Sequence, residues 1–273
     1  MLRPDRGILT WLALVVVLSG CSRLTFIKPD YTRNDYRRTA PELDVTTDAR
    51  GEGSAEARSM ILQGQNFYTR GDLDGARDAA RKALSLAPDS AAAHTLGALV
   101  ADRSGKARDA GEHYLRAVEL APHEGGMLNN YGTWLCANGR AEESLQWFDR
   151  ALADRNYRTP AAAMANAGAC ADQVGQGERA ARYLESALEL QPDNPVALGA
   201  MAAREFRAGR AFHARAFSQR RLAAAPADAD ALMLASQIEK KLGDNAAAAK
   251  YVQRLRTEFP DVSGSGTGDD GKR

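Results

Sequence analysis

The sequence predicts an all-helical protein built from repeated units, and two observations carry this prediction. Alanine is abundant among the 273 residues, only 7% of them are aromatic, and few segments alternate between apolar and polar residues as strands do. Glycines also recur at spacings of 34, 34, 36, 34 and 34, at Gly71, Gly105, Gly139, Gly175, Gly209 and Gly243. A fixed period of this length is typical of stacked helical units.

Small residues and prolines keep the same frame as these glycines. Seven residues before each glycine stand Gly64, Ala98, Gly132, Gly168, Ala202 and Ser236, and five residues after it stand Ala76, Ala110, Ser144, Ala180, Ala214 and Ala248. Small residues let two helices approach, and a glycine without a Cβ readily ends the first helix of a pair. Each unit is expected to close at a proline, namely Pro88, Pro122, Pro160, Pro192, Pro226 and Pro260.

This frame resembles the tetratricopeptide repeat (TPR) over about residues 57–262. The resemblance implies a right-handed superhelix of six TPR helix pairs, with units at 57–90, 91–124, 125–160, 161–194, 195–228 and 229–262. Such a stack buries a core only between neighbouring units, and it leaves a groove lined by the first helices.

The first twenty residues have the character of an export signal. Arg3 and Arg6 precede an eleven-residue apolar run, Ile8–Leu18, which is too short to span a bilayer and fits a secretory signal. The run leads through Ser19 and Gly20 to Cys21, and this ending resembles the bacterial lipobox. The resemblance implies cleavage before Cys21 and attachment of diacylglycerol and palmitate-type acyl chains, whereas a plain signal peptide is the alternative. Such lipid chains anchor a protein durably.

Segments of low order are expected on both sides of the repeats. Residues 21–56 form the lipidated N-terminus and a tether, since they lack helical periodicity and contain Pro29 and Pro41. Residues 263–273 are rich in Gly, Ser and Asp and are expected to be a disordered tail. The tail contains a formal GxGxxG pattern without a preceding strand or a following helix, so it does not predict a dinucleotide site.

Charge balance argues against nucleic acid as a partner. The chain has 36 basic and 35 acidic side chains, and removal of residues 1–20 leaves 34 of each. A protein that gains affinity by neutralising phosphates should be basic overall. Locally, residues 195–228 hold six arginines and two acids. These arginines either pair with acids of neighbouring units or meet an acidic partner or lipid headgroups.

No motif indicates catalysis or a bound metal. None of the four histidines belongs to an HExxH motif or to a Cys/His pair with zinc spacing, and no GxSxG motif is present. His94 is expected to be a packed structural residue. We therefore expect no enzyme activity, no cofactor and no small-molecule substrate.

The groove of the first units is the expected partner site. Generic repeat positions place five side chains along it, namely Ile61, Gln65, Tyr68, Thr95 and Leu99. Ile61 and Gln65 depart from the Lys/Asn clamp with which chaperone-binding TPRs hold a terminal carboxylate. The groove should therefore present apolar to mildly polar groups to a segment of another protein.

Units three and four carry a more specific resemblance. The strings Asn129-Asn130-Tyr131-Gly132 with Leu135-Cys136, the Tyr157-x-x-Pro160 ending and Asn166-x-Gly168-x-Cys170 are similar to the type IV pilus pilotin lipoproteins of the PilF/PilW family. Trp134 stands where that family often has Phe.

The resemblance implies an outer-membrane lipoprotein that binds the pilus secretin and promotes its localisation and multimerisation. It also implies transport by the lipoprotein carrier machinery, and we expect a monomer. The alternative function is a TPR lipoprotein that scaffolds cell-wall hydrolases or the outer-membrane assembly machinery.

A disulfide is expected between Cys136 and Cys170. Both lie on first helices of consecutive units, just past mid-helix, and the position of Cys170 generally faces the preceding unit. Small neighbours such as Gly132 and Gly168 permit the Cα separation of about 5.5 Å that a disulfide requires. An exported compartment is oxidising, and these are the two thiols left once Cys21 is lipidated. Two buried, reduced cysteines are the alternative.

Overall fold

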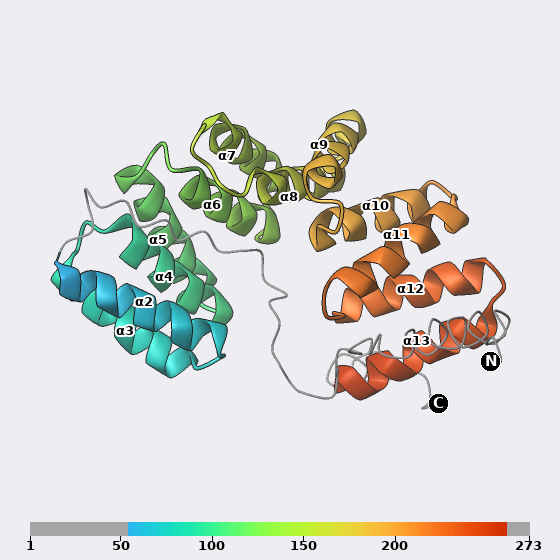
Figure 1. Ribbon diagram of the computed structural model, residues 1–273, viewed down its shortest axis with the longest axis horizontal. Coiled ribbons are helices and arrows are strands. Elements are labelled where there is room, and N and C mark those ends of the chain that lie inside the picture. Colours follow the sequence, from blue (N-terminus) through green and yellow to red (C-terminus); the bar gives the residue numbers. More distant parts are fainter. Residues whose placement is uncertain (1–53, 261–273) are drawn as a thin grey trace, which may run out of the picture. The chain divides into compact units, whose positions relative to one another are not determined.

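The computed structural model describes residues 54–260, which form twelve α-helices and no strand (Figure 1). The predicted signal peptide and tail, and nearly all of the predicted tether, lie outside the described residues. Each helix has 13 to 15 residues, and two consecutive helices make one unit. The pairs are α2(Ala55–Thr69) with α3(Leu73–Leu86), α4(Ala91–Arg103) with α5(Ala107–Leu120), α6(Gly125–Ala137) with α7(Ala141–Ala153), α8(Pro160–Gln173) with α9(Gly177–Leu190), α10(Pro195–Arg207) with α11(Ala211–Ala224), and α12(Ala229–Lys241) with α13(Asn245–Glu258).

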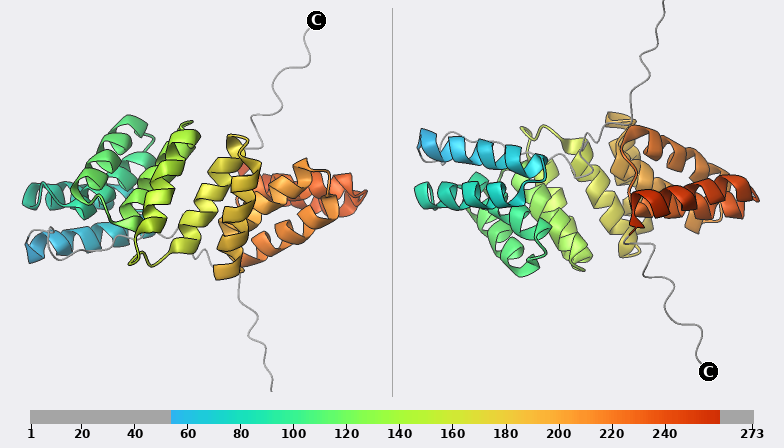
Figure 2. Two further views of the ribbon diagram at one scale, coloured as in Figure 1. Left: turned by 90° about the horizontal axis from the view of Figure 1, so that it is seen from above. Right: turned by 90° about the horizontal axis from the view of Figure 1, so that it is seen from below.

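Consecutive pairs pack against one another in chain order (Figure 1, Figure 2). The second helix of each pair contacts the first helix of the next pair, and several first helices also contact the next first helix. The fold class predicted from the 34-residue period is therefore confirmed as an all-helical stack of helix pairs.

The turn inside each pair depends on its glycine. All six recurring glycines have a positive φ, from 73° to 84°, whereas no other residue type does so in the described part of the chain. This left-handed conformation is inexpensive only without a Cβ. After Gly71 the carboxylate of Asp72 accepts a hydrogen bond from the Gly75 amide at 2.9 Å and starts α3. The sequence frame therefore located every turn correctly.

Small residues allow close contact between helices. A Cβ added to Gly64 would lie 2.4 Å from Cδ2 of Leu96, and one added to Gly168 would lie 2.6 Å from Cγ of Leu184. Real Cβ atoms do not approach so closely, so a larger residue at either position would push the helices apart. Large side chains fill the remaining core, and the fully buried ones include Phe148, Leu96, Leu128, Leu135 and Leu184.

Unit three has two extra residues, and they form a longer link between α7 and α8. Asp154 accepts a hydrogen bond from the Gly125 amide at 3.0 Å, and Tyr157 packs against Gly125, where a Cβ would lie 2.6 Å from its ring. Pro160 was expected to close this unit but instead occupies the first turn of α8. A proline fits there because the amides of the first helical turn have no helical partner.

Candidate binding surface around units three and four

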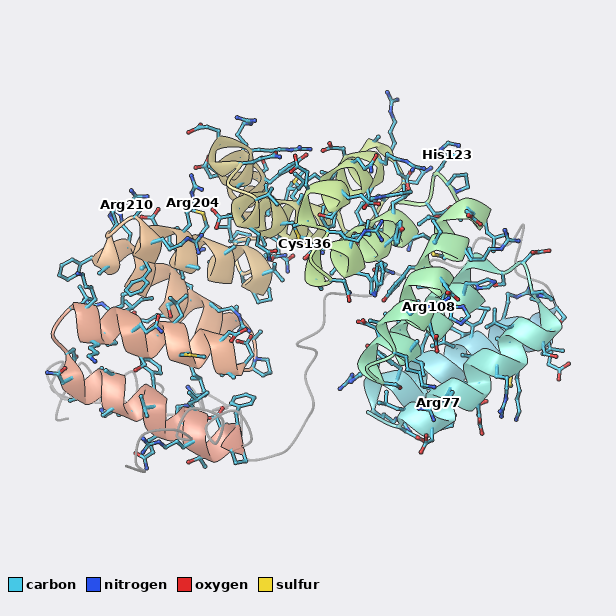
Figure 3. The ribbon with its side chains drawn as sticks, turned by 180° about the vertical axis from the view of Figure 1, so that it is seen from behind. Arg77, Arg108, His123, Cys136, Arg204 and Arg210 are labelled. Carbon is cyan, nitrogen blue, oxygen red and sulfur yellow. A yellow bond between two sulfur atoms is a disulfide. The ribbon has the colours of Figure 1, made fainter. Side chains whose placement is uncertain are left out.

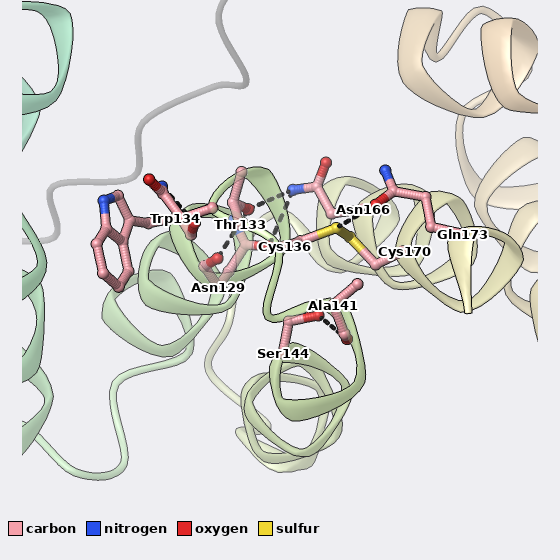
Figure 4. The surroundings of a disulfide bond; sticks show 10 residues. Asn129, Thr133, Trp134, Cys136, Ala141, Ser144, Asn166, Cys170 and Gln173 are labelled. Carbon is pink, nitrogen blue, oxygen red and sulfur yellow. Dashed lines mark hydrogen bonds between the residues drawn. A yellow bond between two sulfur atoms is a disulfide. The ribbon is translucent and has the colours of Figure 1, made fainter. Parts of the chain in front are cut away.

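A disulfide joins the first helices of units three and four. Cys136 on α6 and Cys170 on α8 have their sulfur atoms 2.05 Å and their Cα atoms 6.0 Å apart, which is the pairing predicted from the repeat register (Figure 4). The two half-cystines are 7% and 4% exposed. The bond therefore holds two neighbouring units together from inside the stack.

Buried amides connect the same two helices beside the disulfide. Asn166 on α8 donates from Nδ2 to Oδ1 of Asn129 and to Oγ1 of Thr133 on α6, both at 3.1 Å (Figure 4). Asn129 is 1% exposed and Asn166 is 6% exposed. Because buried polar groups are costly without partners, this network fixes how α8 sits against α6. The two asparagines differ by one position in the repeat frame, ten and nine residues before their turn glycines, and their mutual contact was not predicted.

The expected apolar groove of the first units is not exposed. Ile61 and Thr95 are 0% exposed, Leu99 is 5% and Tyr68 is 9% exposed, so these four side chains belong to the core. Their predicted exposure is wrong, because neighbouring units pack over them. Partner binding at these residues remains a prediction and would require them to become accessible.

The contact between units two and three illustrates this burial. Oγ1 of Thr95 lies 2.8 Å from Sδ of Met127 in the next unit and 2.9 Å from the Ala91 carbonyl.

Gln65 is the one half-buried member of the predicted set. Its Nε2 is buried and has no hydrogen-bond partner among the described residues, and the same holds for Nδ2 of Asn130. Such amides could donate to a carbonyl that reaches them.

The arginines of unit five pair with acids of this chain. Arg204 lies 3.1 Å from Asp172 of unit four, and Arg207 contacts the other oxygen of the same carboxylate. Arg210 forms two hydrogen bonds with Glu205 at 2.6 and 2.8 Å, and these lower the pKa of the Glu205 carboxyl (Figure 3). Arg204 and Arg207 thus pair with an acid of the neighbouring unit four, as the first interpretation expected, whereas Arg210 pairs with an acid of its own unit.

Two histidines that the sequence did not connect lie together in unit two. Nδ1 of His94 is 3.0 Å from Nδ1 of His113, and Nε2 of His94 is 3.0 Å from the Pro88 carbonyl oxygen. Burial lowers the pKa of both rings. In the described part of the chain no three His, Cys, Asp or Glu side chains are grouped so as to hold a metal ion. His94 thus packs within unit two as expected, and its hydrogen bonds to His113 and Pro88 were not predicted.

Residues 54–260 also contain no helix with the length and apolarity needed to cross a lipid bilayer. The expected absence of catalysis and of cofactors remains a prediction.

Comparison with known families identifies the repeat. Residues 61–125 and 124–193 each match a model described as "Tetratricopeptide repeat". Over 210 aligned residues the chain is 29% identical to the type IV pilus assembly protein PilF of Pseudomonas aeruginosa. The alignment covers 77% of this chain and 83% of PilF.

Solved structures show the same relationship. The crystal structure of PilW, described as a widely conserved type IV pilus biogenesis factor, superposes with a TM-score of 0.67 at 29% identity and covers 77% of this chain and 96% of that one. The structure of Pseudomonas aeruginosa PilF gives a TM-score of 0.63 at 27% identity. That match covers 76% of this chain and 93% of the PilF chain. A chain of the APC/C hetero-tetramer Cut9-Hcn1 is similar in fold alone, with a TM-score of 0.66 at 14% identity, and the match covers 74% of this chain and 39% of that one.

Proposed function

We propose that this chain, which is a tetratricopeptide-repeat homologue of the type IV pilus biogenesis proteins PilF and PilW, binds the pilus secretin and helps it to assemble. The observation that carries the proposal is the similarity to PilF, because it extends over most of both chains. A helical repeat stack contributes surface for protein recognition, and its units are held by packing rather than by a cofactor.

The rigid centre of the stack supports a binding role. The disulfide of Cys136 and Cys170 and the amide network of Asn166 hold the first helices of units three and four in one arrangement. A surface that is ordered before it binds loses less conformational entropy when the partner docks. We therefore assign this pair of units the role of a fixed support for the secretin contact.

The proposal includes a lipid anchor at Cys21 and a position on the periplasmic face of the outer membrane. Cys21 lies outside the described residues, and the support for this part is the lipobox pattern of the sequence. An anchor would raise the effective concentration of bound secretin at the membrane without any new contact. Carriage by the lipoprotein transport machinery would then bring the secretin subunit along.

Deletion of the gene tests the proposal in the cell. The amount of heat-stable secretin multimer in outer-membrane fractions should fall to less than a tenth, and twitching motility should be lost. A plasmid copy of the wild-type gene should restore both. Unchanged multimers in the deletion strain would overturn the proposal, and unchanged multimers with altered cell-wall hydrolase activity would favour a scaffold for such enzymes.

A further inference from the structure

The outward face of α11 differs from that of the second helices before it. Four positions of each second helix, which lie three, seven, ten and fourteen residues after the turn glycine, form one stripe along the helix, and they are exposed in units one to five. In units one to three at least two of these four residues are charged, and in unit four all of them are, namely Glu178, Arg182, Glu185 and Glu189. In unit five the stripe consists of four uncharged residues, namely Phe212, Ala216, Gln219 and Ala223. We call these four residues the α11 stripe.

The packing of α11 does not account for this stripe. The helix packs on α10 and α12 with its opposite side, where Ala214 and Ser218 are buried (Figure 1). Phe212 is 69% exposed, which is the largest exposed fraction among the large apolar side chains of residues 54–260. One exposed apolar residue is ordinary, but the loss of charge at all four positions of a stripe that is charged in the preceding units is not. The fold therefore leaves the α11 stripe free for a partner.

The surroundings of the stripe are positively charged. Among the six second helices of the described chain, α11 alone has no acidic side chain. The guanidinium carbon of Arg215 lies 5.4 Å from the centre of the Phe212 ring, and Arg215 is 3.5 Å from Glu239, whose side chain is 5% exposed. Arg220 donates to the Pro192 carbonyl at 2.7 Å, a bond that leaves its charge unneutralised. The apolar stripe is thus flanked by arginines on an exposed face.

The spacing and size of the stripe residues indicate that the occupant is a helix. They recur at intervals of four, three and four, which is the pattern with which one helix packs along another. Ala216 and Ala223 let a second backbone approach closely, while Phe212 supplies one bulky contact. Helices that lie in a membrane surface carry Trp, Phe and Leu on their apolar face, whereas half of this stripe is alanine. The stripe therefore fits a protein helix better than a lipid surface.

The charge of the face determines which kind of helix fits. A second copy of the same face would place arginines against arginines, and such like-charge contact opposes pairing. A helix with acidic residues beside its apolar face would instead place carboxylates near Arg215 and Arg220. Arg and aromatic side chains are also enriched in protein interfaces.

We propose that the α11 stripe, with Arg215 and Arg220 beside it, binds an amphipathic helix of another protein whose apolar face is flanked by Asp and Glu. This surface belongs to a second helix, so it is distinct from the groove lined by the first helices. It does not depend on the proposed secretin contact.

A pair of synthetic helices tests the surface. The first is a fluorescent peptide of about three heptads with leucine at the first and fourth positions of each heptad and glutamate at the fifth and seventh, and the second has lysine in place of glutamate. Each is titrated with the mature chain, made without its signal peptide, while fluorescence anisotropy is followed. We expect saturable binding of the glutamate peptide with a dissociation constant on the order of 10 μM, weakened at least threefold at about 0.5 M salt. The lysine peptide should not bind. Absence of binding by the glutamate peptide, or equal binding of both peptides, overturns the inference.

Two glutamate substitutions locate the binding. Phe212→Glu places on α11 the residue that units three and four have at this position, so the melting temperature should stay within about 2 °C of wild type, while binding of the glutamate peptide weakens at least tenfold. Leu115→Glu makes a matched change on the exposed stripe of α5, where Leu115 is 41% exposed, and should alter binding less than twofold. Equal binding by wild type and both variants overturns the inference.

Two further measurements distinguish the other occupants. Sedimentation with vesicles of phosphatidylglycerol and phosphatidylethanolamine should show no binding that depends on Phe212, and analytical ultracentrifugation should show no dimer that Phe212→Glu abolishes. Either result in the opposite sense would assign the face to a membrane or to a second copy and would overturn the inference. Because the peptides are synthetic, their failure to bind leaves the proposed secretin contact standing, and a failure of secretin binding leaves this result unchanged.

Discussion

At the scale of single residues, the hydrogen bonds of the histidine pair determine where its protons lie. A carbonyl oxygen only accepts, so Nε2 of His94 carries a proton that it donates to Pro88. Nδ1 of neutral His94 is then the acceptor, and His113 donates to it from Nδ1. If both rings were protonated, each Nδ1 would carry a proton and two donors would face each other. The arrangement therefore disfavours the state in which His94 and His113 are both charged.

The pair should make stability fall on acidification. Burial lowers the pKa of His94 and of His113 below the ordinary value of 6.5, so the unfolded chain binds more protons than the folded one. Their contribution is complete above about pH 6.5 and is lost as the pH falls through their folded values. The positive charge of Arg116 also lowers the pKa of His94, whereas the negative charge of Asp89 raises it. Asp109 and Glu112 raise the pKa of His113 and so partly offset the effect of its burial.

Urea unfolding at pH 7.5 and pH 5.5 measures this dependence. The double variant His94→Gln/His113→Gln should lose less stability between the two pH values than wild type does. His123→Gln, which alters an exposed histidine outside the pair, should behave as wild type. Equal pH dependence in the double variant and in wild type would show that the pair does not titrate as described.

The disulfide supports a second residue-scale prediction. The bond closes a loop with a sequence separation of 34, and in the chain-entropy model its loss costs about 3–4 kcal/mol of unfolding free energy. The double variant Cys136→Ser/Cys170→Ser should retain helical content and unfold at a lower denaturant concentration. Thiol labelling of unfolded, unreduced periplasmic protein checks the bond directly, since most molecules should show no free Cys136 or Cys170.

At the scale of helices, Asn166 should decide how firmly α8 is held on α6. Removing its side chain leaves Asn129 and Thr133 without their interhelical donor in a buried place, which costs about 1–3 kcal/mol. Asn166→Ala should therefore lower the unfolding free energy by this amount in a denaturant titration. Asn156→Ala, at an exposed position in the link before α8, is the control and should change it by less than about 0.5 kcal/mol. Equal stability of the two variants would contradict this role.

The helices and turns were predictable because their causes are local. Each turn needs a residue that tolerates positive φ, and the glycine frame marked all six. The pairing of Cys136 with Cys170 was also predictable, since register alone puts both on facing first helices.

The exposure of the expected groove was not predictable in the same way. Whether Thr95 and Leu99 face solvent depends on how tightly the next unit packs over them, which generic repeat positions do not encode. The ring-to-ring contact of His94 and His113 depends on side-chain orientation across two helices and was missed for the same reason.

At the scale of the whole molecule, the proposed anchor makes location depend on one residue outside the repeats. Cys21→Ala should leave the repeat stack folded, because that stack begins more than thirty residues later. The variant should appear in the soluble periplasmic fraction or as uncleaved precursor. Membrane fractionation with circular dichroism of the purified protein checks both statements. A variant that remains in the outer membrane as firmly as wild type would exclude the lipid as its anchor.

The central claim is that the repeat stack itself binds the pilus secretin. Isothermal titration of the purified, disulfide-bonded mature protein with the periplasmic part of the secretin from the same bacterium tests it most directly. We expect saturable one-to-one binding with a dissociation constant of about 1 μM or lower, and at least tenfold weaker binding after reduction of the disulfide. No saturable binding with both proteins at about 100 μM would contradict the claim.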